Sequence, residues 1–377
     1  MVHVIHDACR PSGTLYGIYD IYAGVLEKVA HISDKFELPP RLSVEQASSH
    51  QVAQFRALEI EKVLGSDFSS ADMTGGMGID TLLLSDYGRR SVTYIERNSE
   101  LCTLAERNFS RVCGEGCRIT VVNADSVENL SNAERFDFIY ADPARRSTTG
   151  RKLVSISDCE PDLLPHIDSL LCKCTLMGVK LSPMLDISVA LKELRHVQRL
   201  YVIGLDGECK ELFALLSRDS ITNAENVPIH CVSLPSEGMQ PFTFTISDEQ
   251  SATVRFSMPQ RYLYEPSAVI MKAGAFKSVS ARYGLSKLHP SSHLYTSETL
   301  VEGFPGRTFE ITDVRKVHKP QFKDIDKANL TVRNFPTSVA EIRRNIGVKE
   351  GGDVYLFATT LMDNNKRIIV CKKCYTR

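Results

Sequence analysis

Hydrophobic and polar positions alternate through the first two thirds of the chain in a pattern that predicts strands and helices in turn. Helical spacing of apolar residues occurs at 79–84 and 100–112. Short apolar runs of strand length lie at 71–73, 91–95, 118–122, 136–141, 175–180 and 199–203. Such alternation is typical of a mainly parallel sheet covered by helices on both faces. We expect 211–216 to be the last strand of this sheet.

An amphipathic helix is expected before the first strand, at 42–64. Apolar residues recur near helical spacing at Val52, Phe55, Leu58 and Val63, and Ser48 or Ser49 is placed to cap the helix start. This helix is expected to lie on the domain that follows it.

The pattern changes to short strands after a polar stretch near residue 225. Strands are expected at 242–246 and 253–256, and a small α+β module follows them. This module contains strands at 308–314, 328–333, 354–360 and 367–372, with a helix at 338–346. We therefore predict four parts: a helical segment at 1–66, an α/β domain at 67–240, a strand-rich segment at 241–320 and an α+β domain at 321–377.

A glycine turn joins the first strand to the first helix of the α/β domain. The residues Asp72-Met73-Thr74-Gly75-Gly76-Met77-Gly78 place backbone N–H groups at a helix start, where they can approach a ligand closely. The third glycine of a dinucleotide-binding turn is absent, because Thr81 stands in its place. The sequence Gly-Lys-Ser/Thr of a phosphate loop is also absent from the turn.

Acidic residues lie at the ends of four successive strands of the expected sheet. They are Asp72, Glu96, Asp125 and Asp142. A carboxylate after the second strand can accept hydrogen bonds from ribose hydroxyls, as in nicotinamide and adenosylmethionine sites. Asp125 is placed to accept from the exocyclic amine of adenine. The series predicts a nucleoside-containing cofactor at one edge of the sheet.

The fourth of these strands reads Phe-Asp-Phe-Ile-Tyr-Ala and runs into Asp142-Pro143. Proline lacks the N–H that a strand ladder requires, so the strand ends there. A carboxylate, exposed carbonyls and a rigid backbone can then hold a planar amine beside an electrophile.

These motifs, in this order and spacing, resemble the class I S-adenosylmethionine-dependent methyltransferases over about 42–218. DMTGGMGID is similar to their first motif, YIERN to the acid after the second strand, NADSVENL to the adenine-contacting segment, and DPAR to the motif of enzymes that methylate amino groups. The resemblance implies an α/β, Rossmann-like, doubly wound sheet. It implies cofactor contacts from Asp72, Thr74, Gly75, Gly76, Gly78, Glu96 and Asp125.

LSVEQASSHQVAQFRA, DPARR and KLSPMLD further resemble a bacterial branch with a small ferredoxin-like segment and a carboxy-terminal THUMP-like domain. THUMP domains bind structured RNA, so this similarity implies a tRNA or rRNA substrate. Asp142 and Pro143 are the expected catalytic residues. Arg145, Arg146, Lys180 and Ser182 are expected to bind the substrate.

The substrate motif departs from the family pattern at one point. Amino-methylating enzymes commonly follow Asp-Pro with Pro-Tyr or Pro-Phe, whose ring stacks on the target base, whereas this chain has Ala144-Arg145. The guanidinium of Arg145 can stack on a base or contact a phosphate instead, and a structural role for Arg145 and Arg146 is the alternative.

Charge is distributed unevenly along the chain. The net charge is −1, but residues 241–377 hold 21 Lys and Arg against 13 Asp and Glu. A basic final third favours a polyanionic partner such as RNA, although a solvated basic surface would look the same. The phosphate-facing residues expected in this part are Lys319, Lys323, Lys327, Arg333, Arg343, Arg344 and Lys349.

Several classes of protein are disfavoured by composition. No apolar run approaches the length of about 20 residues that a membrane span needs, and the first residues lack a signal-peptide pattern, so we expect a cytoplasmic protein. The 11 cysteines show no disulfide framework, and Cys172 and Cys174 are expected to be buried packing residues. Cys371 and Cys374 have the spacing of half a zinc site but lack a second pair, so no metal is expected.

The sequence therefore predicts a methyltransferase acting on a base of RNA, through an exocyclic amine. Methylation of a protein or a small molecule is one alternative, and an RNA-binding protein whose methyltransferase domain has lost turnover is another. A nicotinamide dehydrogenase is least favoured, because Asp142-Pro143-Ala144-Arg145 would then have no role.

Overall fold

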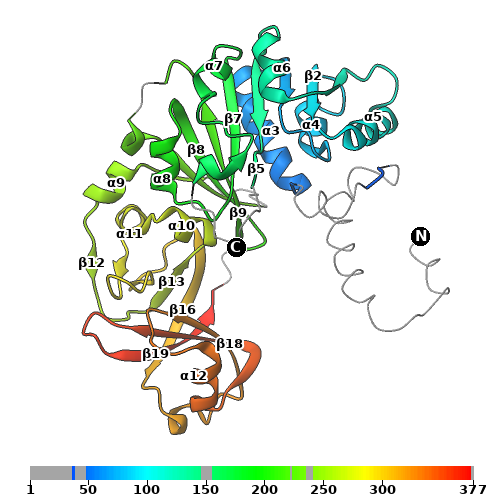
Figure 1. Cartoon of the computed structure of the whole chain (residues 1–377). Coiled ribbons are helices and arrows are strands. Elements are labelled where there is room, and N and C mark those ends of the chain that lie inside the picture. Colours follow the sequence, from blue (N-terminus) through cyan, green and yellow to red (C-terminus); the bar gives the residue numbers. More distant parts are fainter. Residues whose placement is uncertain (1–35, 39–47, 146–154, 221–222, 235–240, 375–377) are drawn as a thin grey trace, which may run out of the picture. The chain divides into compact units, whose positions relative to one another are not determined.

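A computed structural model describes residues 36–38, 48–145, 155–220, 223–234 and 241–374 (Figure 1). The chain forms two compact units. The first contains residues 1–181, 193–196 and 213–220, and the second contains 182–192, 197–212 and 221–377.

The first unit contains five parallel strands in the order β7-β4-β1-β2-β3. Their bounds are β1 Ser70–Asp72, β2 Val92–Glu96, β3 Ile119–Asn123, β4 Phe138–Ala141 and β7 Leu176–Leu181. In this register Asp72 lies beside Tyr94 on one neighbour and Tyr140 on the other. The strands thus end at one common edge, which confirms the predicted α/β sheet.

Helices and short elements of the first unit follow the strands closely. They are α3 His50–Leu64, α4 Ile79–Leu84, α5 Ser99–Cys113, α6 Ser126–Asn132, α7 Ile167–Leu171, η1 Ile156–Asp158, β5 Ala144–Arg145 and β6 Cys159–Glu160. Ala57, Leu82, Tyr94 and Phe109 come from three helices and one strand and share one hydrophobic core. This core lies directly under the glycine turn.

The buried face of helix α3 differs from the predicted one. Leu58 is 51% exposed and Val63 is 37% exposed, whereas Arg56 is buried together with Val52, Ala53, Ala57 and Ile60. Ser49 occupies the N-cap position, but its side chain makes no capping hydrogen bond. The prediction of the face was wrong because Arg56 has a buried polar environment that apolar spacing does not reveal.

The second unit contributes strands to both large sheets. The sheet that contains β1 has nine strands in the order β11-β10-β8-β9-β7-β4-β1-β2-β3. The added elements are α8 Ile187–Glu193, β8 Val197–Leu205, β9 Glu208–Leu216, η2 Ala224–Asn226, β10 Ile229–Leu234 and β11 Phe242–Phe244. The expectation that 211–216 is the last strand was wrong, because β10 and β11 extend the same sheet beyond the polar stretch.

An eight-stranded sheet occupies the rest of the second unit, in the order β12-β14-β15-β13-β16-β19-β18-β17. Its strands are β12 Arg255–Phe256, β13 Tyr262–Pro266, β14 Ser286–Lys287, β15 Tyr295–Ser297, β16 Gly306–Arg315, β17 Lys327–Arg333, β18 Lys349–Thr360 and β19 Lys366–Lys373. The helices are α9 Ile246–Ser251, α10 Ala268–Ala273, α11 Phe276–Tyr283, η3 Lys319–Phe322 and α12 Val339–Ile346.

Both faces of this second sheet are buried. Along β18, Leu356 and Ala358 belong to the core under α12, whereas Phe357 belongs to a core that contains Leu263 and Phe309. Neighbouring side chains of a strand point to opposite faces, so one strand supplies two cores. The predicted α+β character of the tail is confirmed.

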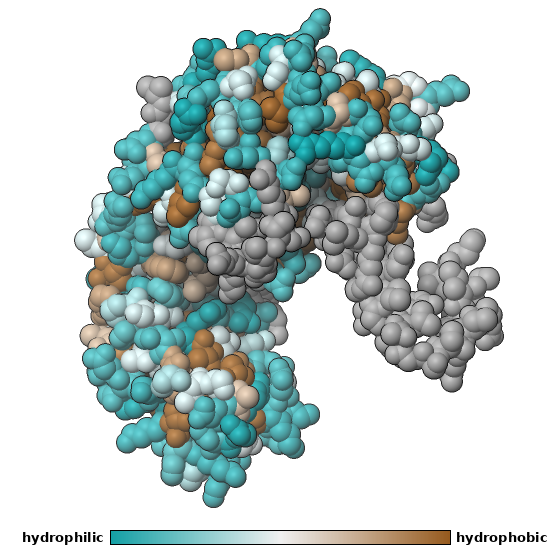
Figure 2. Space-filling view, in the orientation of Figure 1, coloured by the Kyte–Doolittle hydropathy of each residue, from teal (hydrophilic) through white to brown (hydrophobic). Residues whose placement is uncertain are grey.

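The surface in view is mainly hydrophilic, with scattered apolar side chains (Figure 2). No helix among the described residues is long and apolar enough to cross a membrane. Cys174 is buried, as predicted, but Cys172 is exposed, so that half of the prediction was wrong.

Candidate active site

The glycine turn packs closely against the rings of Tyr94 and Phe109. A Cβ atom added to Gly75 would lie 2.3 Å from the Tyr94 ring, and one added to Gly78 would lie 2.6 Å from the ring of Phe109. Those two rings contact each other edge to face, with centroids 5.6 Å apart. The Tyr94 hydroxyl also donates a hydrogen bond to the Gly76 carbonyl (2.7 Å). The turn therefore needs glycine to lie this close to the core.

Asp72 fixes the shape of the turn from within. Its Oδ1 accepts a hydrogen bond from the Thr74 N–H (3.0 Å), and its Oδ2 accepts one from the Thr81 hydroxyl (2.7 Å). Burial, with the nearby charge of Asp80, raises the pKa of Asp72 to about 7. Because both carboxylate oxygens accept hydrogen bonds from residues of the turn and of α4, the main role of Asp72 is to hold the shape of the turn.

Glu96 joins the end of β2 to the same turn. Its Oε2 accepts from the Gly76 N–H (3.0 Å), and its Oε1 accepts from the Asn98 N–H (2.9 Å). The side chain is only partly buried. Each carboxylate oxygen can accept a second hydrogen bond, so Glu96 is oriented and still able to bind hydroxyl groups.

Asp125 is held at the start of α6. Its Oδ1 accepts from the Glu128 N–H (3.0 Å), which caps the helix, and its Oδ2 pairs with Arg97 Nη2 at 2.5 Å. The backbone hydrogen bond from Glu128 and the Arg97 guanidinium lower the pKa of Asp125. Arg97 also pairs with Glu160 at 2.5 Å. Sequence patterns did not reveal Arg97 or Glu160, because exposed residues acquire such partners only in the fold.

Asp142 lies at the end of β4, beside the glycine turn. Its backbone N–H donates to the Thr74 hydroxyl (2.7 Å), and its Oδ2 accepts from Lys180 Nζ (2.5 Å). The Asp142 side chain is 31% exposed and that of Lys180 is 15% exposed. The fold thus brings together Thr74, Asp142 and Lys180, which were predicted separately as cofactor, catalytic and substrate residues.

Lys180 continues into a polar cluster that the sequence did not reveal. Its Nζ also donates to the Ser48 hydroxyl (3.1 Å), and Ser48 donates to Asp80 Oδ2 (3.0 Å). Buried Arg56 donates to Ser48 (2.9 Å) and forms an ion pair with Asp80. Although burial acts to raise it, the charges of Arg56 and Lys180 hold the pKa of Asp80 below its usual value.

The residues after Asp142 form a short ladder. Pro143 is buried, and Ala144 and Arg145 pair in β5 with Glu160 and Cys159 of β6. Arg146 lies outside the described residues. The Ser182 hydroxyl accepts a hydrogen bond from the Met184 N–H (3.2 Å) in the turn after β7.

The basic residues expected to face phosphate have varied surroundings. Arg333 pairs with Glu265, Arg343 donates to the Ala328 carbonyl, and Lys349 pairs with Asp326. The described residues contain no group of three or more His, Cys, Asp or Glu that could hold a metal ion.

The fold and the edge formed by the turn, Glu96 and Asp142 define a class of Rossmann-like methyltransferases, and the comparisons agree. Residues 262–305 match a ferredoxin-like domain, and residues 306–373 match a THUMP domain-like model. The chain is 34% identical to a proposed methyltransferase from Porphyromonas gingivalis W83, with a TM-score of 0.85 over 97% of this chain and 93% of that chain. No curated protein matches this chain.

More distant structures are similar over part of the chain. A proposed class I S-adenosylmethionine-dependent methyltransferase from Listeria monocytogenes is 12% identical, with a TM-score of 0.37 over 57% of this chain and 72% of that chain. An rRNA methylase from Streptococcus thermophilus is 16% identical, with a TM-score of 0.32 over 43% of this chain and 93% of that chain. At these identities and TM-scores, both structures are only distantly similar to this chain.

The chain belongs to the family of the P. gingivalis protein, the methyltransferases with ferredoxin-like and THUMP-like domains. The predicted family and enzyme class are thereby confirmed.

Proposed function

We propose that the enzyme methylates an exocyclic amine on a base of structured RNA, either rRNA or tRNA, and that Asp142 directs the reaction. The observation that carries this proposal is the position of Asp142-Pro143 beside the glycine turn, with the carboxylate fixed by Lys180. An acceptor at this edge suits a planar amine that must be aligned with an electrophile.

The cofactor side of the edge is assigned to the predicted residues. Bound S-adenosylmethionine supplies a methyl group on a good leaving group. In this proposal Glu96 accepts hydrogen bonds from the ribose hydroxyls, and Asp125 accepts one from the adenine amine. The N–H groups of Thr74, Gly75, Gly76 and Gly78 donate within the fold, so the turn is assigned a close backbone contact with the remainder of the cofactor.

Asp142 and Pro143 are assigned to the acceptor. Among the described residues, the hydrogen bond to the Asp142 carboxylate comes to Oδ2, which leaves Oδ1 for the amine. With the Pro143 carbonyl, Oδ1 accepts hydrogen bonds from the amine and orients its lone pair toward the methyl group. Lys180 is assigned a positioning role, since its ammonium group donates to Oδ2 and fixes the orientation of the carboxylate.

An RNA substrate is supported by the match of 306–373 to a THUMP domain-like model and by the basic excess of residues 241–377. Lys and Arg contacts to phosphates position RNA without reading its sequence. We assign Arg145, Arg146, Lys180 and Ser182 to the substrate side. RNA binding by the full chain should therefore weaken as salt concentration rises.

The direct test is transfer of a labelled methyl group from S-adenosylmethionine to separated rRNA, tRNA and protein fractions. We expect label in one RNA fraction and, after nucleoside analysis, on an exocyclic amine. The Asp142→Ala variant should leave that fraction unlabelled. Label confined to protein or to small molecules would overturn the RNA assignment.

A further inference from the structure

One cavity lies within the second unit, and its lining includes no residue assigned above to catalysis or cofactor binding. Its volume is about 540 Å³, which falls within the usual range for small-ligand sites. Its walls come from the β8–β9 turn, β10, the start of β11, the β13–α10 junction and the starts or ends of β16 and β17. Strands from both the ferredoxin-like and the THUMP-like segments therefore contribute to one concave site.

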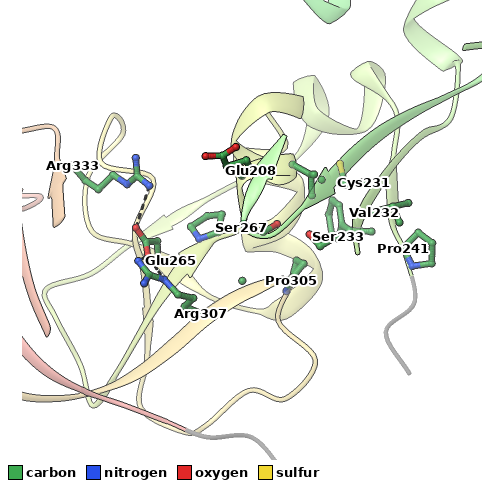
Figure 3. Close-up of a pocket in the computed structure, with 17 residues that line it drawn as sticks. Glu208, Cys231, Val232, Ser233, Pro241, Glu265, Ser267, Pro305, Arg307 and Arg333 are labelled. Atoms are coloured by element: carbon green, nitrogen blue, oxygen red, sulfur yellow. Dashed lines mark hydrogen bonds and ion pairs between the residues drawn. The ribbon is translucent and has the colours of Figure 1, made fainter. Parts of the chain in front are cut away.

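One wall carries two arginines on a single buried carboxylate. Glu265 is 3% exposed and accepts from Arg307 Nε at 2.8 Å and from Arg333 Nη2 at 3.1 Å. Figure 3 shows Glu265 between the two guanidinium groups. Two positive charges against one negative charge leave this wall with a net charge of +1. Because the carboxylate fixes both guanidiniums, little side-chain entropy is lost when they bind an anion.

The arginines retain capacity for a ligand. The Arg307 side chain is 47% exposed and that of Arg333 is 34% exposed. Arg333 Nε is buried and has no hydrogen-bond partner in the described structure, and the same holds for Ser267 Oγ. Buried donors without partners are costly, so an acceptor such as a phosphate oxygen would stabilise this wall.

The remaining walls suit the rest of a nucleotide. Val232, Phe242, Pro266 and Val269 provide apolar surface. Ser233, beside Val232 in Figure 3, adds a hydroxyl group. The one other acidic residue of the lining is Glu208, whose charge is paired with Lys210 at 2.8 Å. A site with a cationic wall, apolar walls and a few hydroxyl groups fits a ligand with a phosphate at one end and a flat base at the other.

We propose that this cavity binds a nucleoside phosphate, with the phosphate on Arg307 and Arg333 and the base against the apolar walls. Two sources share this chemistry: one nucleotide of an RNA chain and a free mononucleotide. The RNA source rests on the proposed function, whereas nucleotide binding itself does not.

The test uses the full chain with its cofactor site filled by S-adenosylhomocysteine, and uridine 5′-monophosphate as the probe. Calorimetry should detect binding of the monophosphate and much weaker binding of uridine. Arg307→Gln and Arg333→Gln should each weaken the monophosphate at least about tenfold, since each removes a charge-assisted hydrogen-bond donor. Arg261→Gln is the matched control, because Arg261 is 58% exposed, pairs with Glu310 and does not line the cavity.

Affinity for S-adenosylhomocysteine and the unfolding temperature check that each variant is folded. Competition by a short uridine oligonucleotide assigns the cavity to RNA, and its absence assigns the cavity to free nucleotides. No binding of the monophosphate to wild type, or wild-type affinity for it in both arginine variants, would overturn the proposal. RNA methylation without nucleotide binding would sink only this inference, and nucleotide binding without RNA methylation would sink only the proposed function.

Discussion

The glycine turn and Asp142 lie side by side, but different interactions hold them in place. The turn is shaped by uncharged packing of Gly75 and Gly78 on Tyr94 and Phe109, together with internal hydrogen bonds. Asp142 is instead fixed by an ion pair with Lys180. If the proposed assignment holds, the cofactor side should be sensitive to added volume and the substrate side to removed charge.

The largest expected effect is on the pH dependence of stability, through the buried carboxyl of Asp72. Its carboxyl ionises near its ordinary pKa of 3.8 in the unfolded chain, whereas burial in the fold raises this pKa to about 7. The folded state thus holds an extra proton between these values, and the free energy of unfolding falls as pH rises through them. The fall is at most about 4 kcal/mol, at about 1.36 kcal/mol per pKa unit.

Asp72→Asn removes this titration. Urea unfolding of wild type and variant at several pH values should show that the variant gains stability relative to wild type as pH rises from about 4 to about 7. Parallel profiles for the two proteins would mean that Asp72 does not titrate in this range.

Gly75→Ala tests the packing of the turn. The added Cβ would overlap the Tyr94 ring, and overpacking of this kind costs about 1–3 kcal/mol, so affinity for S-adenosylhomocysteine should fall by roughly tenfold to a hundredfold. Gly114→Ala is the control for a glycine outside the turn: its Cβ would meet no atom within 4 Å, so only the backbone strain of its φ of +71° is added and affinity should stay unchanged. Unchanged affinity in Gly75→Ala would show that the turn can move without loss of the site.

Lys180→Met tests the substrate side and should have a smaller effect. Loss of the charge-assisted hydrogen bond to Asp142 should lower the rate of transfer about tenfold and leave cofactor affinity unchanged. Lys180→Arg keeps the charge and should recover part of the rate. A drop in cofactor affinity alone would place Lys180 on the cofactor side instead.

Local patterns in the sequence were enough to predict the parallel sheet and most of its strands. Helix α4 was predicted at its observed bounds, and strands β1 and β2 within one residue, because apolar runs and glycine punctuation are local signals. The extension of the sheet by β10 and β11 was missed, because β10 joins it by parallel pairing with β8, a strand that is not its neighbour along the chain.

The acidic residues of the candidate site were predicted from the sequence, but the residues that pair with them were not. Asp72, Glu96, Asp125 and Asp142 are marked by their places after strands. Arg56 and Asp80 lie 24 residues apart and become a buried ion pair only when α3 packs on α4. Arg97 and Glu160 are 63 residues apart. Single-sequence patterns carry no information on such long-range pairs.

The proposed assignment of Glu96 to the cofactor and Asp142 to the substrate is tested most directly by calorimetric titration of S-adenosylhomocysteine into Glu96→Ala and Asp142→Ala. We expect Glu96→Ala to bind at least about tenfold more weakly than wild type, because the ribose hydroxyls lose a charged acceptor. Asp142→Ala should bind as wild type does while its methyl transfer is lost. Wild-type affinity in Glu96→Ala, or an equal loss of affinity in both variants, would contradict the account.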